Sequence, residues 1–346
     1  MRAVARAGAG VNNVPVTECS DAGIVVFNTP GANANSVKEL VLAGLLLASR
    51  DLVGGMNFVN SLSGLADEGE LNRLVEAEKK KFKGQELYGK SLGVVGLGAI
   101  GSMVARAALD LGMHVLGYDP AISVDAAWRL PSDVKRMPDL PSLFARSDYV
   151  TLHVPLLPQT ESMIDVTSLK SFKQGSVLLN FSRQPIVATL ALKEALDSGR
   201  LRRYVADFPV SELLGHEKVN LMPHLGASTA EAEDNCAIMA VNQLTDFLQT
   251  GNIHNSVNFP EVSLELNEGF RLAIANRNEP GALGQITAIL GEREINVVDM
   301  LNKSRDQVAY TLIDIASEPD MDLLEALKEI DSVINVRVFD NGATRC

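Results

Sequence analysis

The sequence predicts an α/β protein with a doubly wound parallel sheet in its middle and a second, smaller α/β unit at its C-terminal end. Between residues 91 and 206, short apolar β-branched runs alternate with helical segments, a pattern typical of βαβ units and of a parallel sheet covered on both faces. Between residues 270 and 340 the patterns give the order βαββαβ, which is typical of a ferredoxin-like unit. A chain of 346 residues is long enough for about two to three domains.

Composition and charge exclude several classes of protein. The sequence has 43 acidic and 31 basic residues and a net charge of −12, which disfavours nucleic acid as a partner. The longest apolar run, Leu40 to Ala48, is far shorter than the roughly 20 residues that cross a bilayer, so it predicts a buried helix and no membrane span. Three widely separated cysteines without metal-ligand spacing predict no disulfide framework, no metal site and a cytoplasmic setting: Cys19, Cys236 and Cys346.

The first 83 residues open on a predicted small apolar strand and a glycine-rich turn, MRAVARAGAGVNNV, and continue with a second strand and helices. Residues 14–28 predict a helical stretch followed by the strand IVVFN, and the turn TPGANAN leads to an apolar helix. Ser36, with Glu39 three residues later, matches a capping box, so we place the start of that helix at Ser36. Residues 53–83 become increasingly charged, which predicts an exposed helical arm that lies either at a subunit contact or as a plain solvated face.

The strongest local motif is Gly-Leu-Gly-Ala-Ile-Gly at residues 96–101. It follows the predicted strand SLGVV and precedes a predicted helix, the context in which such a turn binds a dinucleotide. Gly96 makes the tight turn, Gly98 lets the backbone approach the pyrophosphate, and Gly101 allows close packing of helix on strand. Asp119, at the end of the next strand, suits the adenosine ribose and repels a 2′-phosphate, which favours NAD over NADP. The alternative is a glycine turn required for packing alone.

Redox chemistry at a carbinol or carbonyl requires a group that exchanges a proton near neutral pH, and histidine is the usual choice. His224 lies in the predicted loop PHLGAST among small residues, whereas His153 ends a predicted strand where ligands of such sheets bind. His114 lies inside an apolar strand and is interpreted as a core residue. On the residues alone, His224 and His153 both stay candidates within the full set of His114, His153, His216, His224 and His254.

Three motifs follow the glycine turn in order: NFSR at 180–183, ADFPVSE at 206–212 and PHLGAST at 223–229. Together they resemble the NAD-dependent D-isomer-specific 2-hydroxyacid dehydrogenases. RAGAGVNNV at 6–14 and NTPGANANSVKEL at 28–40 are similar to the members that oxidise D-3-phosphoglycerate to 3-phosphohydroxypyruvate, the first step of L-serine biosynthesis. The resemblance covers essentially the whole chain and implies that activity here.

The resemblance implies a catalytic trio of Arg183, Glu212 and His224. His224 would take the hydroxyl proton while hydride passes to the nicotinamide, and Glu212 would hold the imidazole and stabilise its protonated form. Arg183 would clamp the substrate carboxylate and polarise the C2 oxygen. On its residue type alone, Glu212 is one acid among 43, so its role rests wholly on the match.

The resemblance also implies the residues that contact substrate and cofactor. Arg6 would face the substrate phosphate, and the backbone of Gly8, Ala9 and Gly10 would face its carboxylate. Read without the match, Arg6 is a surface arginine. Beyond the glycine turn and Asp119, the implied cofactor contacts are Ala9, Ala99, Ile100, Val154, Phe181, Ser182, Arg183, Asp207, His224, Leu225, Gly226 and Ala227.

The C-terminal unit resembles an ACT domain, through the run from Asn276 to Leu283 and through Ile295-Asn296-Val297. This resemblance implies that L-serine binds to the amide side chains of Asn276, Asn278 and Asn296 and inhibits the enzyme by feedback. The alternative is a dimerisation module without a ligand.

The resemblance further implies how the domains are arranged. A flavodoxin-like substrate domain, made of residues 1–55 and 224–252, would carry the NAD-binding domain at 56–223, arm included, as an insertion. Residues 253–268 lack a helical or strand period and are interpreted as a linker to the ACT domain at 269–346. We expect a homo-oligomer.

Two departures from the family pattern keep other hypotheses open. Family members begin with a further strand and helix of the substrate domain, so we expect a partial, N-terminally incomplete substrate domain with exposed apolar edges. Gln184-Pro185 stands where the family has glycine after the arginine, and a side chain there would crowd the nicotinamide side. The alternatives are a dehydrogenase of another 2-hydroxy acid and a truncated, non-catalytic protein that binds NAD or serine.

Overall fold

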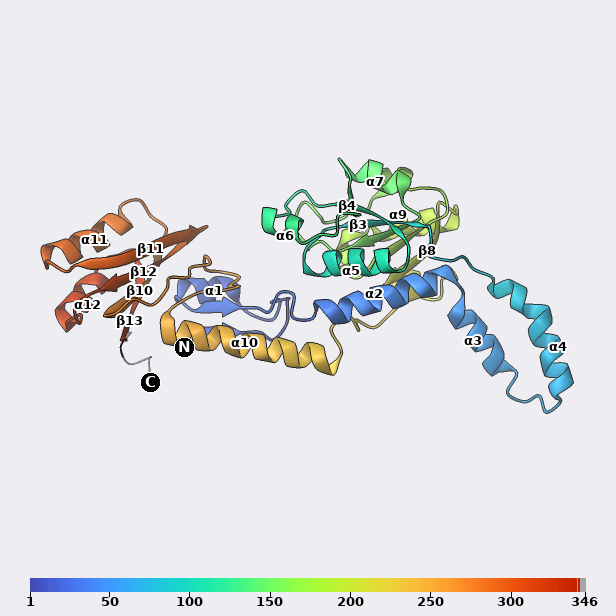
Figure 1. Ribbon diagram of the computed structural model, residues 1–346, viewed down its shortest axis with the longest axis horizontal. Coiled ribbons are helices and arrows are strands. Elements are labelled where there is room, and N and C mark those ends of the chain that lie inside the picture. Colours follow the sequence, from blue (N-terminus) through green and yellow to red (C-terminus); the bar gives the residue numbers. More distant parts are fainter. Residues whose placement is uncertain (341, 343–346) are drawn as a thin grey trace. The chain divides into compact units, whose positions relative to one another are not determined.

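The computed structural model describes residues 1–340 and 342, the side chain of Asp125 excepted, and divides into two compact units (Figure 1). The first unit comprises Met1–Ala32 and the chain from Glu233 onward, and the second is Asn33–Ala232. Within this part of the chain, no helix combines the length and apolarity needed to cross a membrane.

The second unit is built on a seven-stranded sheet in which every neighbouring pair is parallel. The order is β5-β4-β3-β6-β7-β8-β9, so the chain winds outward in both directions from the β3–β6 pair, as predicted for a doubly wound sheet. The short edge strands β5 and β9 were not predicted. The bounds are β3 (Ser91–Val95), β4 (His114–Tyr118), β5 (Lys135–Arg136), β6 (Tyr149–Leu152), β7 (Ser176–Asn180), β8 (Leu201–Ala206) and β9 (Val219–Leu221).

Helices cover both faces of this sheet and bury two separate apolar clusters. On one face, Val41 of α2 (Ala34–Ser49) and Ala105 of α5 (Ala99–Asp110) pack with Val94 of β3. The other face is covered by α7 (Leu140–Arg146), α8 (Val166–Lys170) and α9 (Thr189–Asp197). Every residue of β7 is buried, because a central parallel strand is covered on both sides. A short helix, α6 (Val124–Trp128), follows β4.

The start of α2 differs from the prediction. The helix begins at Ala34 with Asn33 at the N-cap, and no side chain caps it. Ser36 is buried inside the first turn, so its interpretation as the N-cap was wrong. The apolar side chains on both sides of Ser36 are also buried, and packing rather than local capping therefore sets where this helix begins.

Beyond α2 the chain forms the exposed helices predicted for residues 53–83 (Figure 1). Phe58 packs against Phe82 with ring centroids 5.6 Å apart, which joins the two sides of the arm. On the first helix of the arm, the side chains of Met56 and Val59 are more than half exposed. The arm consists of α3 (Leu52–Ser61), α4 (Glu68–Glu78) and the 3-10 turn η1 (Lys79–Phe82).

The first unit holds two sheets. A two-stranded parallel sheet is flanked by α1 (Val16–Asp21) and by α10 (Ala230–Thr250), of which all but the first turn lies in this unit. The second sheet is antiparallel with the order β11-β12-β10-β13, and its elements follow the predicted βαββαβ order. The remaining bounds are β1 (Ala3–Ala5), β2 (Val25–Phe27), β10 (Phe270–Arg277), α11 (Ala282–Glu292), β11 (Val297–Arg305), β12 (Val308–Ile315), α12 (Met321–Lys328) and β13 (Val333–Asp340).

One apolar core joins the two sheets of the first unit. Phe27 of β2 stacks edge-on against Phe247 of α10, and both belong to a buried cluster with Tyr310 and Phe339 of the antiparallel sheet. The connecting residues 253–268 contribute to the same cluster, since Phe259 is fully buried. The antiparallel sheet therefore completes the core over which β1 and β2 pack.

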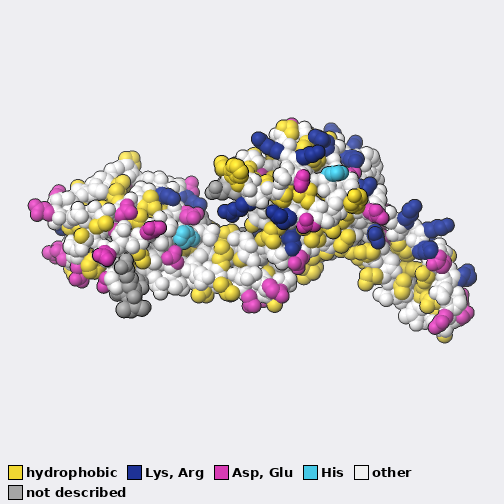
Figure 2. Space-filling model, viewed as in Figure 1, with side chains coloured by type: hydrophobic (Ala, Val, Ile, Leu, Met, Phe, Trp, Pro, Cys, Tyr) yellow, Lys and Arg dark blue, Asp and Glu magenta, His cyan; other side chains and the backbone are white. Residues whose placement is uncertain are grey.

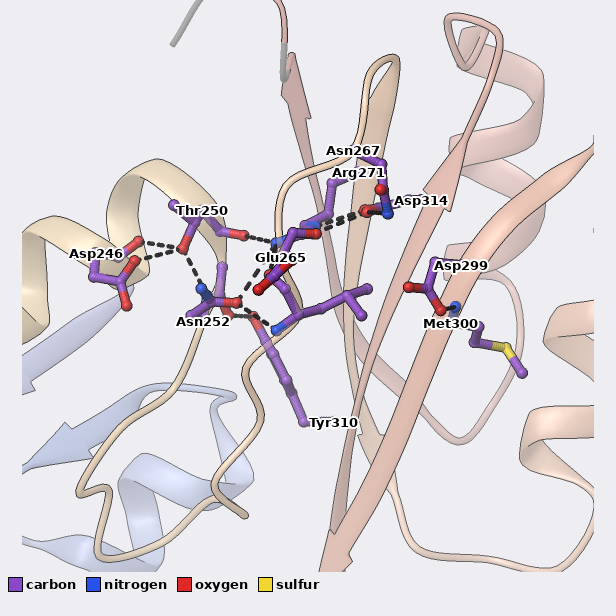
Figure 3. A network of polar contacts seen from close by, with 12 residues as sticks. Asp246, Thr250, Asn252, Glu265, Asn267, Arg271, Asp299, Met300, Tyr310 and Asp314 are labelled. Carbon is purple, nitrogen blue, oxygen red and sulfur yellow. Dashed lines mark hydrogen bonds and ion pairs between the residues drawn. The ribbon is translucent and has the colours of Figure 1, made fainter. Parts of the chain in front are cut away.

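A buried arginine network reinforces this junction (Figure 3). Arg271 of β10 and Asp314 of β12 are both fully buried, and Arg271 Nε lies 2.6 Å from Asp314 Oδ1. The same guanidinium donates to the carbonyl oxygens of Thr250, Leu264 and Glu265 at 3.1, 3.1 and 2.7 Å. The end of α10 and the connecting segment are thus held on the sheet by a charge that is both paired and fully hydrogen-bonded.

Candidate active site

The glycine turn lies directly after β3 and uses its glycines for different reasons. Gly96 has a φ of +87°, and a Cβ there would lie 2.4 Å from the carbonyl oxygen of His153. A Cβ on Gly101 would lie 1.9 Å from the carbonyl oxygen of Gly96, so helix α5 can approach the strand only with glycine at this position. Around Gly98, by contrast, no atom lies within 4 Å of an added Cβ. The open space is therefore at Gly98, at the N-terminus of α5.

These features fit the pyrophosphate of a dinucleotide. The N–H groups in the first turn of α5 have no acceptor within the helix, and they present the positive end of the helix dipole to the space beside Gly98. Asp119, half-buried after β4, accepts the N–H of Leu97 at 2.8 Å and that of Ala121 at 2.9 Å. It thus braces the glycine turn, and each carboxylate oxygen keeps a further lone pair for a ribose hydroxyl.

The turn after β7 carries the predicted arginine. Asn180 fixes this turn, because its amide accepts the N–H of Ser182 at 3.1 Å and donates to the carbonyl oxygen of Arg183 at 2.9 Å. Ser182 Oγ in turn donates to the carbonyl oxygen of Leu152 at the end of β6. The side chain of Gln184 donates to Thr189 Oγ1 at 3.3 Å, which directs it toward the start of α9. Arg183 itself is half-buried on a rigid, strand-anchored turn.

The histidine loop is held by a buried carboxylate. Asp207, directly after β8 and 2% exposed, accepts the N–H groups of Leu225 and Gly226, each at 2.7 Å. His224 has a φ of +58°, a left-handed conformation that costs free energy for a residue with a Cβ. Its ring lies 4.8 Å from that of Phe208, between centroids. Asp207 thereby fixes the backbone that presents the exposed imidazole of His224.

Glu212 lies on an exposed 3-10 turn, η3 (Ser211–Leu213). Ser211 Oγ donates to Glu212 Oε2 at 2.7 Å, and this hydrogen bond holds the pKa of Glu212 below its usual range. Among the described residues no hydrogen bond or ion pair joins Glu212 to His224. Asp207 is therefore the acid that contacts the histidine loop in this structure.

His153 and His114 differ from His224 in their surroundings. The His153 ring is enclosed at the end of β6, where its Nε2 lies 2.9 Å from Thr151 Oγ1, and burial lowers its pKa to about 3. With its pKa lowered in this way, His153 is a weak base near physiological pH, which favours His224 as the proton acceptor. His114 is the exposed first residue of β4, so its interpretation as a core residue was wrong.

The other residues predicted to contact the cofactor follow the same strands. Ala99 and Ile100 lie in the first turn of α5, Val154 follows His153, Phe181 follows β7, and Ala227 ends the histidine loop. Because the carboxyl ends of parallel strands lie at one edge of a sheet, the turns after β3, β6, β7 and β8 share that edge. The second unit therefore holds the predicted cofactor residues other than Ala9, together with Arg183 and the His224 loop, along the carboxyl edge of its sheet.

The predicted substrate loop lies in the first unit. Gly8 accepts the N–H of Thr29 through its carbonyl oxygen at 3.1 Å, and Asn28 Nδ2 donates to the carbonyl oxygen of Ala9 at 2.7 Å. The Arg6 guanidinium lies over Gly8, where a Cβ would be 2.5 Å from Arg6 Nη1. Gly10 completes the loop and is half-buried. The loop is therefore a short, hydrogen-bonded turn. The Arg6 side chain can lie over residue 8 because that residue is glycine and has no Cβ.

Of the three asparagines predicted to bind an effector, one lies in the antiparallel sheet of the first unit and two lie directly beside its strands. Asn276 near the end of β10 is 3% exposed; its Nδ2 donates to the carbonyl oxygen of Arg277, and its Oδ1 is buried without a partner. Asn278 is exposed and donates to the carbonyl oxygen of Asp306 at 3.0 Å. Asn296 is exposed just before β11.

Comparison with known proteins identifies the family. A family model described as the D-isomer specific 2-hydroxyacid dehydrogenase, NAD binding domain, matches residues 57–226. D-3-phosphoglycerate dehydrogenases of Haemophilus influenzae and Escherichia coli K12 are each 34% identical to this chain, over 95% of it and 79% of their own length. The chain belongs to the D-isomer specific 2-hydroxyacid dehydrogenases. This dehydrogenase accordingly uses NAD, and the resemblance carried by its motifs is confirmed.

Solved structures agree with that assignment. The NAD+-bound 3-phosphoglycerate dehydrogenase of Entamoeba histolytica is 27% identical with a TM-score of 0.58, and the match covers 74% of this chain and 75% of that one. The holo D-mandelate dehydrogenase of Rhodotorula graminis is 27% identical with a TM-score of 0.65 over 76% of each chain. The 2-hydroxyacid dehydrogenase fold is thus shared with enzymes of different substrates.

Proposed function

We propose that this dehydrogenase oxidises D-3-phosphoglycerate to 3-phosphohydroxypyruvate, the first step of L-serine biosynthesis. The observation that carries the proposal is the gathering of the glycine turn, Arg183 and the Asp207-held His224 loop at one edge of one sheet. The names of the relatives in H. influenzae and E. coli support the choice of substrate.

The proposed roles follow from charge and position. His224, exposed and fixed by its loop, accepts the proton of the substrate hydroxyl. Arg183, on its anchored turn, pairs with the substrate carboxylate and polarises the oxygen on C2. Bound NAD supplies the hydride acceptor. Glu212 holds the His224 imidazole in the working enzyme, and the hydrogen bond from Ser211 to its Oε2 leaves carboxylate lone pairs for the histidine.

Substrate selection is assigned to the loop of the first unit. Arg6 binds the substrate phosphate, and the backbone of Gly8 to Gly10 binds its carboxylate through N–H groups other than that of Gly8, which donates to the carbonyl oxygen of Arg6. A guanidinium suits phosphate because it donates two parallel hydrogen bonds. The Arg6 guanidinium lies over Gly8, next to the backbone assigned to the carboxylate, which supports this role.

We assign a substrate domain to residues 1–55 and 224–252, the NAD-binding domain with its arm to 56–223, a linker to 253–268 and an ACT domain to 269–346. The βαββαβ sheet and the buried, unpartnered Oδ1 of Asn276 support serine binding with Asn278 and Asn296. Exposed apolar side chains on α3, Met56 and Val59 among them, support a homo-oligomer formed through the arm. We place the enzyme in the cytoplasm.

The test is NADH formation by the purified chain with D-3-phosphoglycerate, with hydrazine to trap the product. His224→Ala abolishes turnover. The control His114→Ala keeps it, because His114 is exposed at the first residue of β4, away from the carboxyl ends of the strands where the site lies. A titration with NAD accompanies both. NAD binding without turnover by the unaltered chain supports the non-catalytic alternative instead.

A second candidate, a dehydrogenase of another 2-hydroxy acid, is favoured by the likeness to a D-mandelate dehydrogenase. Arg6→Ala separates the two. Under our proposal it raises the KM for D-3-phosphoglycerate and leaves the slow turnover of D-lactate or D-mandelate unchanged. Faster turnover of an unphosphorylated acid by the unaltered chain contradicts the proposed substrate.

A further inference from the structure

Three basic side chains line one cavity beside the glycine turn. Lys38, Arg106 and Arg129 share with Gly98 and Ala99 the wall of a cavity of about 460 Å³. Lys and Arg side chains also gather over α5 and α6 on the face seen in Figure 2. In a chain with a net charge of −12, this clustering of positive charge is unusual.

Lys38 is held in this position by the core. Its neighbours Val37 and Val41 on α2 are buried in the cluster that contains Ala105 of α5, so the two helices pack as a fixed pair. Only 19% of the Lys38 side chain is exposed, a low fraction for a lysine. Its Nζ donates to Asn35 Oδ1 at 2.7 Å and is 3.5 Å from Glu39 Oε1, which leaves one of its three N–H groups for a ligand.

Arg106 and Arg129 add charge to the same cavity. Arg106 lies one turn after Ser102 on α5, and helical side chains point toward the N-terminus of their helix, here toward the glycine turn. Within the described part of the chain, no hydrogen bond or ion pair joins either arginine to an acid. Asp110 is the acid among the described residues of the cavity wall, so the cavity keeps an excess of positive charge.

We propose that Lys38 binds the pyrophosphate of the dinucleotide, and that Arg106 and Arg129 attract the cofactor to the cavity. The glycine motif offers backbone N–H groups but no cationic side chain, whereas the pyrophosphate carries two negative charges. A half-buried ammonium group beside the helix N-terminus supplies the missing charge where screening by salt is weak. This inference rests on the proposed use of NAD at the glycine turn.

The experiment is a calorimetric titration of the full chain with NAD and with ADP-ribose at low and high salt. Lys38→Met weakens both affinities about tenfold, the loss expected for one charged hydrogen bond. The matched control is Lys193→Met on the exposed side of α9, and it leaves both affinities unchanged. The double variant Arg106→Met with Arg129→Met slows NAD association at low salt and has less effect at high salt.

Adenosine, which has no phosphate, separates a phosphate contact from a general disturbance of the site. It competes equally well for the unaltered chain and for Lys38→Met if the lysine acts on the pyrophosphate. NAD affinity of Lys38→Met within twofold of that of Lys193→Met overturns the inference while leaving the proposed function intact. An unaltered chain that binds no NAD overturns both.

Discussion

The carboxylate of Asp207 receives the N–H of Gly226 at 2.7 Å and lies so near that a Cβ on this glycine would be 2.9 Å from Oδ2. Its other oxygen receives the N–H of Leu225. A carboxylate buried to this extent is stable only because both oxygens accept hydrogen bonds. The pair fixes the entry to α10 and, with it, the unfavourable backbone of His224.

Asp207→Asn tests this relationship. The amide keeps one acceptor but turns an NH₂ group toward the second backbone N–H, so one hydrogen bond is lost and the histidine loop loosens. We expect a loss of about 1–3 kcal/mol in the free energy of unfolding and a drop of about 100-fold in kcat/KM. Urea melts and steady-state kinetics measure both, and the exposed Asp197→Asn is the control. Unchanged kinetics would remove Asp207 from the positioning of His224.

Substitutions at two glycines of the glycine turn are expected to change different properties of the enzyme: NAD affinity at Gly98 and stability at Gly101. Gly98→Val enters open space, so the melting temperature stays near that of the unaltered chain while NAD affinity falls more than tenfold, because the side chain fills the space for the phosphates. Gly101→Ala brings a Cβ against the carbonyl oxygen of Gly96 and lowers stability by about 1–3 kcal/mol. Thermal melts and NAD titrations distinguish them, and equal NAD affinity of Gly98→Val and the unaltered chain would contradict the assignment.

The pH dependence of stability has a sign set by His153. Burial lowers its pKa to about 3, whereas the unfolded chain binds a proton near pH 6.5. Above pH 6.5 both states are neutral at this residue, and between pH 6.5 and about 3 only the unfolded state is protonated. Stability therefore falls as the pH drops through this window, by up to about 1.4 kcal/mol per pH unit.

Urea melts at pH 7.5, 6 and 5 measure this dependence. His153→Gln removes the titrating ring, and we expect its stability to vary less over this range than that of the unaltered chain. His114→Gln is the matched control, since that ring is exposed in both states. Parallel curves for His153→Gln and the unaltered chain would show that folding does not lower the pKa of this ring.

Arg271→Met leaves the buried Asp314 with the amide of Asn267 but without its cationic partner, and it removes one donor from each of three carbonyl oxygens. We expect a loss of roughly 3–5 kcal/mol in the first unit. Hydrogen exchange then rises in residues 250–277 and stays unchanged in residues 91–118, because the network lies wholly in the first unit. The exposed Arg293→Met serves as control. Slow exchange maintained at 250–277 would assign the stability of this junction to the apolar core alone.

The parallel sheet could be predicted because its strands are short, apolar and separated by helices. The glycine turn was recognisable for the same reason, since a strand and a helix flank it. The edge strand β5 was missed because its two residues, Lys135 and Arg136, are exposed and give no apolar signal. Edge strands are held by backbone pairing, which leaves little trace in side-chain pattern.

The site could be predicted in part. Position after a strand marks Asp119 and Arg183, but the contact of Asp207 with the histidine loop joins residues 18 and 19 apart and depends on tertiary structure. Phe208, which stacks on His224, carries no sequence signal of its own. The position of Lys38 beside the glycine turn could not be predicted, because this lysine lies within a run that matches a capping box. Glu212 hydrogen-bonds to Ser211 and makes no hydrogen bond or ion pair with His224 among the described residues, so its role remains a prediction.

The first unit has a consequence for synthesis on the ribosome. Asn335 in β13 donates to the carbonyl oxygen of Gly23, 312 residues earlier, and Phe27 is buried in the same cluster as Phe339. Strands β1 and β2 emerge before residues 33 to 232, yet their apolar partners in α10 and the antiparallel sheet are translated after those residues. The segment that carries β1 and β2 must therefore be kept from aggregating until these partners have emerged.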